Sequence, residues 1–528
     1  MPALTTSPAH RLTRRRMLAL ATAVSATAAV APGLTFGHQS ASTPEVERSP
    51  VAMSLDADAS SLLQRVADAV VTAMQQHLVP GAAVGVIVGD REEHAVFGIA
   101  STSSLRPVTP ETRFQIGSVT KTVTGTGIWR LIDEGSLDLD APLRTYLPDL
   151  TLMDAEAAEL VTVANLLDHS GGWYGDEGFD TGSSDDALAR YVADRVPELP
   201  QVFSPGQFFS YNNAGFSMLG RLIEVSTGTD YRTAIRQLVI DPLGMDDSTL
   251  DHDEVRARPY ADGHQALVVN GQLTLAVATP LWLPRSVDSA GGIWSTTRNL
   301  VRYARFHMAN GVVPGPANIL GPEALALMRE PVIDVPGATT LQMGRDWFVQ
   351  DLDGVRVASH GGDTVGQHAD LVMIPEYGFA MTVLTNSQGG GAAVAAAALD
   401  AALAEIPELA SLVGRVGLGP EMSVAPDTAP VDVAPERLTE YVGRFADPGQ
   451  SLTFTATNDG LSVLLETLVQ PGAFTVDLNP APLPELPVSF VADDIAALGQ
   501  ARIPFVRDAD GTVRWVSMGL RLLPRVDD

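Results

Sequence analysis

Hydrophobic and polar residues follow patterns that divide the chain into a mixed region and a strand-rich region. Apolar residues recur at helical spacing over residues 59–77, and Pro80-Gly81 ends that pattern. Two strand-like runs follow, at 82–88 and 94–99, joined by a short polar turn. Residues 118–134 again show helical spacing, with Thr and Gly filling the first half. The mixed region therefore opens with a helix, a hairpin and a second helix.

The same region closes with a second hairpin and another helix. Residues 369–374 and 379–385 are apolar runs separated by Pro375-Glu376-Tyr377-Gly378, and residues 392–404 predict an Ala-rich helix. An antiparallel sheet that takes strands from both ends of the region, with helices on its faces, accounts for this pattern. From residue 438 onward, short strand-like runs alternate with turn residues and predict an all-β segment. These runs lie at 452–456, 461–465, 474–477, 488–491, 503–507 and 513–518.

The ends of the chain add an export signal and linkers to this picture. We expect residues 1–37 to be a signal of the twin-arginine type, because Arg14-Arg15-Arg16 precedes a short apolar run. No later stretch is long and apolar enough to span a bilayer, so we expect an exported protein, periplasmic or extracellular, without stable membrane insertion after signal removal. The expected units are the signal at 1–37, a linker at 38–58, the mixed domain at 59–414, a linker at 415–435 and an all-β domain at 436–528.

Charge excludes several classes of partner, and the absence of cysteine excludes several kinds of site. The formal net charge is −29, and residues 1–37 carry four arginines and no acidic residue, so the remainder carries −33. Such a surface repels nucleic acid and anionic membranes, and neither is an expected partner. The chain has no cysteine, which excludes disulfides and thiolate metal sites.

A single lysine, Lys121, stands among the 34 Lys and Arg residues of the chain. Arg is effectively always protonated, whereas a buried Lys can lose its proton and act as a base. Ser118 lies three residues earlier in the expected helix, so the two side chains share a face. Ser118-x-x-Lys121 therefore pairs a nucleophile with a base one turn away.

Two further segments carry residues suited to the same chemistry. A tyrosine beside a lysine ammonium can have a lowered pKa and pass protons, which makes Tyr211 a candidate, and Asn213 can hold the lysine or a substrate amide. His360-Gly361-Gly362-Asp363 stands directly before the second hairpin, where the glycines allow a substrate to approach the strand. The His and Asp residues between 360 and 370 lack the His-Glu-x-x-His spacing, so we expect no metal site.

In this order and at these distances, the motifs resemble those of the class C β-lactamase and penicillin-binding-protein family of serine hydrolases, over about residues 60–410. The resemblance includes Leu166-Leu167-Asp168-His169-Ser170-Gly171-Gly172 and Ala290-Gly291-Gly292. It implies an α+β fold, an α/β sandwich whose antiparallel sheet of five or more strands has helices on both faces, beside a helical subdomain. Residues 436–528, which include Tyr441-Val442-Gly443-Arg444-Phe445, resemble the lipocalin-like all-β barrel domain appended to some of these proteins.

The resemblance also implies a mechanism. Ser118 attacks a carbonyl and forms an acyl-enzyme, while Lys121 and Tyr211 share the acid–base work. The backbone N–H groups of Ser118 and Asp363 hold the oxyanion. Asn213 and His360-Gly361-Gly362 contact the substrate, and the family needs no metal or organic cofactor.

One departure from the lactamase pattern affects the expected substrate. The third motif of lactamases begins with Lys, whereas here it begins with His360. No permanent cation is then expected to wait for a substrate carboxylate. We expect a secreted serine hydrolase acting on a D-amino-acid peptide or small ester, like the D-Ala carboxypeptidases and D-aminopeptidases of the family. The alternatives are a broad-specificity esterase, a weak β-lactamase, or, in another class, a non-catalytic receptor that binds penicillin-like peptides.

Overall fold

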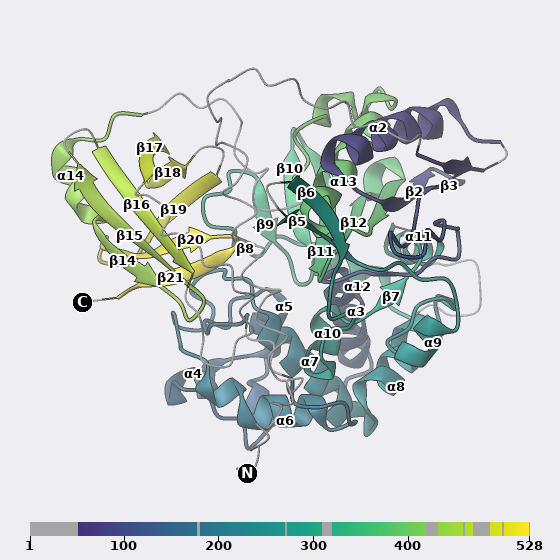
Figure 1. Ribbon diagram of the computed structural model, residues 1–528. Helices are drawn as coiled ribbons and strands as arrows, with labels where there is room; N and C mark the ends of the chain where they lie inside the picture. Colours follow the sequence, from purple (N-terminus) through teal and green to yellow (C-terminus); the bar gives the residue numbers. More distant parts are fainter. Residues whose placement is uncertain are drawn as a thin grey trace, which may run out of the picture.

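The computed structural model describes residues 51–56, 58–176, 180–269, 272–308, 319–417, 431–457, 460–467, 486–498 and 501–526. The expected export signal, most of both expected linkers and the strand expected at 474–477 lie outside these ranges. The described residues form a sheet flanked by helices, a helical subdomain below it and a barrel beside both (Figure 1).

Within the described residues, the main sheet has nine antiparallel strands in the order β1-β3-β2-β13-β12-β11-β10-β9-β8. The expected sheet with strands from both ends is confirmed, because β13 pairs with β2. β1 lies inside the expected linker at 38–58 and pairs with β3, so the sheet begins earlier than the sequence pattern indicated. The strands are β1 (Met53–Leu55), β2 (Gly81–Val88), β3 (Arg91–Gly98), β8 (Ile333–Asp334), β9 (Leu341–Met343), β10 (Phe348–Leu352), β11 (Val355–Thr364), β12 (Gln367–Ile374) and β13 (Phe379–Thr385).

Helices cover both faces of this sheet. On one face, α2 (Ser61–His77) and α13 (Gln388–Ala404) pack against each other and against the strands. On the other face, α11 (Thr297–Met308) covers β2 and β13 and separates them from solvent. Side chains of β2 alternate between the two faces of the sheet. Val84 packs on the face covered by α2 and α13, whereas the neighbouring Ala83 packs on the face covered by α11.

The helical subdomain lies between β3 and β8 in sequence and meets one face of the sheet through α3 (Figure 1). Two short two-stranded ribbons, β4–β7 and β5–β6, accompany it. The helices are α3 (Val119–Asp133), α4 (Ala155–Leu160), α5 (Val163–Leu167), α6 (Ala187–Asp194), α7 (Asn213–Thr227), α8 (Tyr231–Ile235), α9 (His252–Arg256), α10 (Asp288–Gly291) and α12 (Pro322–Met328). The ribbons are β4 (Phe114–Gln115), β7 (Trp294–Ser295), β5 (His264–Val269) and β6 (Gln272–Val277).

After α14 (Pro435–Tyr441), eight strands close into a barrel, as the resemblance implied. β14 pairs with both β15 and β21, which leaves no free edge. Aromatic side chains, including those of Tyr441, Phe454 and Phe505, fill the interior, so this barrel has a packed core. The strands are β14 (Gly443–Ala446), β15 (Gln450–Thr457), β16 (Gly460–Thr467), β17 (Leu486–Ala492), β18 (Ile495–Leu498), β19 (Ala501–Arg507), β20 (Val513–Met518) and β21 (Arg521–Val526).

The barrel docks on the subdomain through the β20–β21 hairpin. The indole N–H of Trp515 donates to the carbonyl of Val202 at 2.9 Å. The amide of Leu522 donates to the hydroxyl of Ser210 at 3.1 Å, and the amide of Tyr211 donates to the carbonyl of Leu520 at 2.9 Å. The hairpin therefore contacts the segment that carries the second expected motif.

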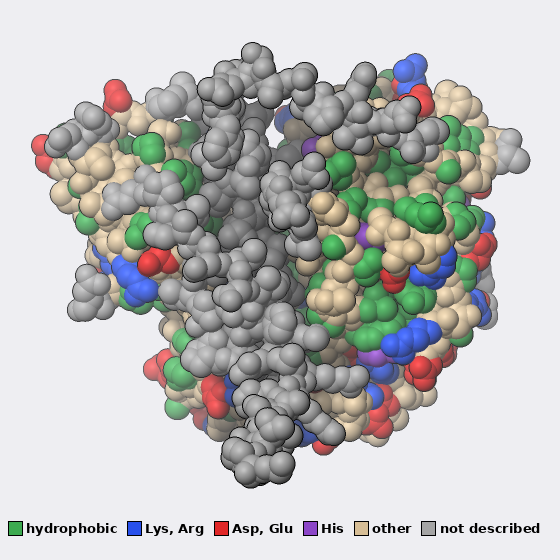
Figure 2. Space-filling view, in the orientation of Figure 1, with side chains coloured by type: hydrophobic (Ala, Val, Ile, Leu, Met, Phe, Trp, Pro, Cys, Tyr) green, Lys and Arg blue, Asp and Glu red, His purple; other side chains and the backbone are tan. Residues whose placement is uncertain are grey.

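Acidic and basic side chains are interspersed over the part of the surface that Figure 2 draws in colour. Many of them form ion pairs, such as Arg305 with Glu92 and Arg356 with Asp351. Among the helices described here, none combines the length and the apolar character needed to cross a membrane.

Candidate active site

The start of α3 carries Ser118 and Lys121 and lies in the interior of the molecule. The chain enters α3 from β4 through Gly117, whose φ of +51° lies in the left-handed region that favours glycine. Ser118 is the N-cap residue, yet its hydroxyl caps no helix amide. The hydroxyl therefore remains available to other partners.

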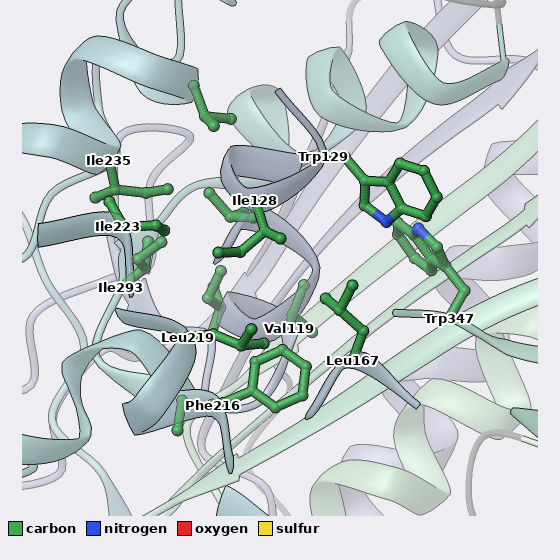
Figure 3. Close-up of a cluster of buried hydrophobic side chains, with 14 of the residues drawn as sticks. Val119, Ile128, Trp129, Leu167, Phe216, Leu219, Ile223, Ile235, Ile293 and Trp347 are labelled. Atoms are coloured by element: carbon green, nitrogen blue, oxygen red, sulfur yellow. The ribbon is translucent and has the colours of Figure 1, made fainter. Parts of the chain in front are cut away.

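α3 is a rigid support, because nearly every residue along it is buried. Figure 3 shows the apolar side chains around it, with Trp129 near its end beside Trp347. The hydroxyls of Thr122, Thr124 and Thr126 bond to carbonyls of the preceding turn, so the polar side chains of this buried helix have partners. A helix fixed in this way holds its first turn in one position.

The amine of Lys121 lies 3.0 Å from the hydroxyl oxygen of Ser118. It also donates to the carbonyl of Ala290 at 2.7 Å, so the Ala290-Gly291-Gly292 segment fixes the lysine from the opposite side. The side chain of Lys121 is fully buried. The sequence prediction of a serine–lysine pair on one helical face agrees with this geometry.

Burial lowers the pKa of Lys121 well below its ordinary value, and the positive charge of Arg521 lowers it further. Asp176 and Asp346 act in the opposite direction but more weakly. Among the described residues, no carboxylate forms an ion pair with Lys121. These effects favour the neutral amine, which is the form that can accept a proton from Ser118.

Tyr211 lies beside this pair, with the Lys121 amine 5.0 Å from the centre of its ring. Burial raises the pKa of Tyr211, and neither the nearby Ser118 hydroxyl nor the charge of Arg521 offsets the effect. The expected lowering is therefore wrong, because the neighbouring lysine is not held as an ammonium ion. Tyr211 remains a neutral phenol, which suits a proton donor. His169 stacks on its ring at 4.3 Å and orients it.

β11 approaches the start of α3 so closely that only glycine fits. A Cβ on Gly362 would lie 2.1 Å from the carbonyl oxygen of Ile116 and 2.6 Å from the amide nitrogen of Ser118. A Cβ on Gly117 would lie 2.8 Å from the amide nitrogen of Asp363. The two backbone amides expected to hold an oxyanion are thus brought to the same place.

His360 lies at the same end of β11 and is buried, with its Nδ1 2.7 Å from the carbonyl oxygen of Gly361. Its ring centre lies 6.3 Å from that of Tyr211. Burial lowers the pKa of His360 to about 3, so the imidazole is neutral near pH 7. This agrees with the expectation that His360, at the start of the third motif, carries no permanent positive charge.

His368, which the sequence analysis considered only as a metal ligand, holds Asp363. The imidazole of His368 lies 2.9 Å from a carboxylate oxygen of Asp363 and 2.7 Å from one of Asp370. Burial opposes its charge, but the two carboxylates outweigh burial and raise its pKa well above the ordinary value. A charged His368 therefore orients the residue that supplies the second amide.

Asn213 begins α7 and reaches a partner other than the expected lysine. Its side-chain amide donates to Asp176 at 2.8 Å. The same Asp176 oxygen accepts from Arg521 at 2.9 Å, and its second oxygen lies 2.5 Å from Nε of Arg521. Asn213, Asp176 and Arg521 thus form one connected group at the edge of the site.

Arg521 is the main site residue that sequence reasoning missed. It belongs to β21 of the barrel, and its guanidinium carbon lies 4.9 Å from the ring centre of Tyr211. Burial opposes its charge, but Asp176 outweighs burial and the pKa of Arg521 is raised. The expectation of no permanent cation at the site is therefore wrong. No local motif marks this arginine, because only docking of the barrel brings it here.

Asp346 is a second unexpected acidic residue near the site. It is fully buried, its φ is +123°, and neither carboxylate oxygen has a hydrogen-bond partner. The carboxyl group lies where a side chain on Gly125 would start, since a Cβ there would be 2.1 Å from it. Burial raises the pKa of Asp346 well above its ordinary value, which favours the protonated form.

A pocket lies beside the site. Within the described ranges, no group of three His, Asp or Glu residues is arranged to hold a metal ion. A pocket of about 520 Å³ is lined by Trp282, Leu283 and the ion-paired Arg232, among others. Leu283 borders the site, because a Cβ on Gly291 would lie 3.2 Å from it and 3.7 Å from the carbonyl carbon of Gly117.

The sequence of this chain is similar to those of several known proteins. A family profile described as "Beta-lactamase" matches residues 66–405. Penicillin-binding protein 4 of Amycolatopsis lactamdurans is 37% identical over 319 residues, covering 59% of this chain and 82% of that protein. Esterase EstB of Burkholderia gladioli is 33% identical over 234 residues, covering 40% of this chain and 58% of the esterase.

Solved structures extend the similarity into the barrel. The crystal structure of SurE matches 88% of this chain and 99% of its own, with a TM-score of 0.69 and 26% identity. SurE with D-Leu matches the same shares with a TM-score of 0.67. A class C β-lactamase from Rhodobacter sphaeroides shares the fold, at 22% identity and a TM-score of 0.51 over 65% of this chain and 99% of its own.

Proposed function

Because the chain belongs to the β-lactamase family of serine hydrolases, we propose that it cleaves an amide or ester through an acyl intermediate on Ser118. The observation that carries this proposal is the 3.0 Å approach of a buried Lys121 amine to the Ser118 hydroxyl. A neutral amine at this distance can take the hydroxyl proton as the oxygen attacks a carbonyl.

The proton passes around the site in a closed sequence. Lys121 takes the proton of Ser118 as the acyl bond forms, and the amides of Ser118 and Asp363 stabilise the oxyanion. Tyr211 donates its phenolic proton to the leaving group and is reprotonated from Lys121. Water then attacks the acyl-serine while Lys121 accepts a proton from it, and Lys121 returns this proton to the Ser118 oxygen as the ester bond breaks, which restores both residues.

The substrate we favour is a peptide that contains a D-amino acid and carries a carboxylate. Arg521 supplies a fixed positive charge beside Tyr211, in place of the lysine that the third motif lacks. One structural relative is described in complex with D-Leu, a free D-amino acid. The pocket beside Leu283 offers room for a larger acyl chain.

Three alternatives remain as outcomes of the test. A broad-specificity esterase would use the same Ser118 with little need for Arg521, and one relative is named an esterase. A weak β-lactamase would exploit Arg521 against the carboxylate of a β-lactam. A non-catalytic receptor would acylate once and fail to deacylate.

We further propose that the protein works outside the cytoplasmic membrane. The arginine-rich start of the chain followed by an apolar run supports export by the twin-arginine route. Its partners would be small molecules or peptides, because the net charge of −29 disfavours nucleic acid.

A substrate panel tests the proposal. Short p-nitrophenyl esters, acyl-D-Ala-D-Ala peptides and nitrocefin would be compared with wild-type protein and with Ser118→Ala. We expect turnover of esters or D-peptides to exceed that of nitrocefin, and no turnover by the variant. Nitrocefin turnover equal to that of the best ester would overturn the substrate class, and turnover by Ser118→Ala would overturn the nucleophile.

A further inference from the structure

A carboxylate of the protein itself lies at the edge of the candidate site. Asp176 follows the Gly-rich segment Gly171-Gly172-Trp173-Tyr174-Gly175, and its side chain is only 10% exposed. It accepts from Asn213 at 2.8 Å and from Arg521 at 2.9 Å. These donors are an amide and a guanidinium, the pair of groups that recognise a carboxylate in many binding sites.

Each of the three nitrogens of the Arg521 guanidinium lies against an oxygen of the protein. Two of its nitrogens face Asp176, at 2.9 and 2.5 Å, and the third donates to the carbonyl of Gly519 at 2.7 Å. The backbone on either side of Arg521 is fixed to Ser210 and Tyr211 by the barrel hairpin. A substrate carboxylate that binds the Nε and Nη2 side of the guanidinium must therefore compete with Asp176.

We propose that Asp176 is a resident carboxylate that occupies, at rest, the subsite for the carboxylate of the substrate. This inference rests on the proposed function and deepens it, because it names the residue that controls how well acidic substrates bind. A tethered group competes at a high effective concentration. Asp176 thus weakens binding of carboxylates and leaves uncharged substrates unaffected.

The alternative role of Asp176 is that of a permanent counter-ion for Arg521. Removal of one partner of a mostly buried ion pair is strongly destabilising, and in that role any change at Asp176 would harm all substrates alike. Asp176→Asn separates the two roles, because the amide oxygen can still accept from Asn213 and Arg521 while the negative charge is gone.

The first experiment measures KM for matched substrates. Wild-type protein and Asp176→Asn would be given an acyl-D-Ala-D-Ala peptide, its C-terminal amide and p-nitrophenyl butyrate. We expect KM for the acid to fall about tenfold in the variant, the effect of losing one competing charge-assisted hydrogen bond. The ratio of KM for the acid to KM for its C-terminal amide should fall by the same factor. A KM that rises for acid and amide together would overturn the inference.

The second experiment needs no turnover, so it separates failure of this inference from failure of the proposed function. Thermal unfolding would be followed with added D-alanine and with D-alaninamide. We expect D-alanine to raise the midpoint of Asp176→Asn more than that of wild type, D-alaninamide to raise neither, and Arg521→Met to abolish the effect. An equal response of wild type and Asp176→Asn to D-alanine, or none in either protein, would overturn the inference whatever the enzyme hydrolyses.

Discussion

The response to burial distinguishes Lys121 from the arginines that provide nearly all other positive charge in this chain. An amine in an apolar environment loses its proton more readily, whereas a guanidinium stays charged. Burial raises the pKa of Tyr211, so its phenol keeps its proton, whereas the buried amine of Lys121 loses its proton more readily. Ser118 therefore has a neutral base, Lys121, and a neutral acid, Tyr211, close to it.

Lys121→Arg should be nearly as inactive as Lys121→Ala, because arginine restores the charge but cannot serve as the base. The expected loss in kcat/KM for ester hydrolysis is about 10²–10⁴-fold, the usual contribution of general acid–base catalysis. Steady-state rates of both variants check this, with circular dichroism as the control for folding. An arginine variant that keeps more than about a tenth of the wild-type rate would mean that only charge is needed.

In wild type, kcat/KM should fall as the pH drops through the lowered pKa of Lys121, since protonation removes the base. The acid limb of a pH–rate profile for an uncharged ester reports this pKa. Arg521→Met removes the second cause of the lowering, so its acid limb should shift to higher pH. A shift to lower pH in that variant would contradict the account.

Strain at Asp346 gives a prediction for stability. Its φ of +123° suits glycine, and its buried carboxyl group has no partner. Asp346→Gly should therefore stabilise the protein by about 1–2 kcal/mol, the cost of such a backbone conformation. Asp346→Asn keeps the strain and serves as the control. Urea midpoints measure the difference, and a glycine variant less stable than the asparagine variant would contradict the prediction, because relief of the backbone strain would then not outweigh loss of the side chain.

At the scale of elements, the site forms where β11 and the start of α3 touch backbone to backbone. The sequence predicted the helix, the hairpin after β11 and the glycine pair, because periodicity and turn residues are local signals. It could not predict that Gly362 lies against the Ser118 amide, since that contact joins segments far apart in the chain. The resemblance to the β-lactamase family was the reason to expect that the Ser118 and Asp363 amides lie together.

Gly362→Ala should separate β11 from α3. The added methyl group would lie 2.1 Å from the Ile116 carbonyl, and neither backbone can move without shifting an oxyanion amide. We expect kcat to fall at least about 10²-fold, as on loss of an oxyanion donor. Gly389→Ala, where a Cβ meets nothing within 4 Å, is the matched control and should keep full activity. Equal activity of the two variants would refute the proposed oxyanion geometry.

At the scale of the whole molecule, the barrel is part of the site. The sequence predicted an all-β domain but not its docking, because the hydrogen bonds of Leu520 and Leu522 to the hydrolase domain leave no pattern in either segment. For the same reason Arg521 could not be distinguished from the other arginines. The export signal and the linkers remain predictions from composition alone, since they lie largely outside the described residues.

Stability should depend on pH through buried carboxyl groups in both domains. Burial raises the pKa of Asp168, Asp288 and Asp447 to about 6, so the folded state binds more protons than the unfolded state between about pH 4 and 6. Stability contributed by these groups therefore falls as pH rises through that window. Asp168→Asn should reduce this loss of stability by about 2 kcal/mol between pH 4.5 and 7. Urea midpoints check this, with the exposed Asp149→Asn as a control that should keep the wild-type slope.

The covalent acyl-enzyme is the central claim, and the site of labelling tests it most directly. Wild-type protein, Ser118→Ala and Lys121→Arg would be treated with a fluorophosphonate and analysed by intact mass and peptide mapping. The account predicts a single adduct on Ser118 in wild type, none in Ser118→Ala and much slower labelling in Lys121→Arg. An adduct on another residue, or labelling of Lys121→Arg as fast as wild type, would contradict it.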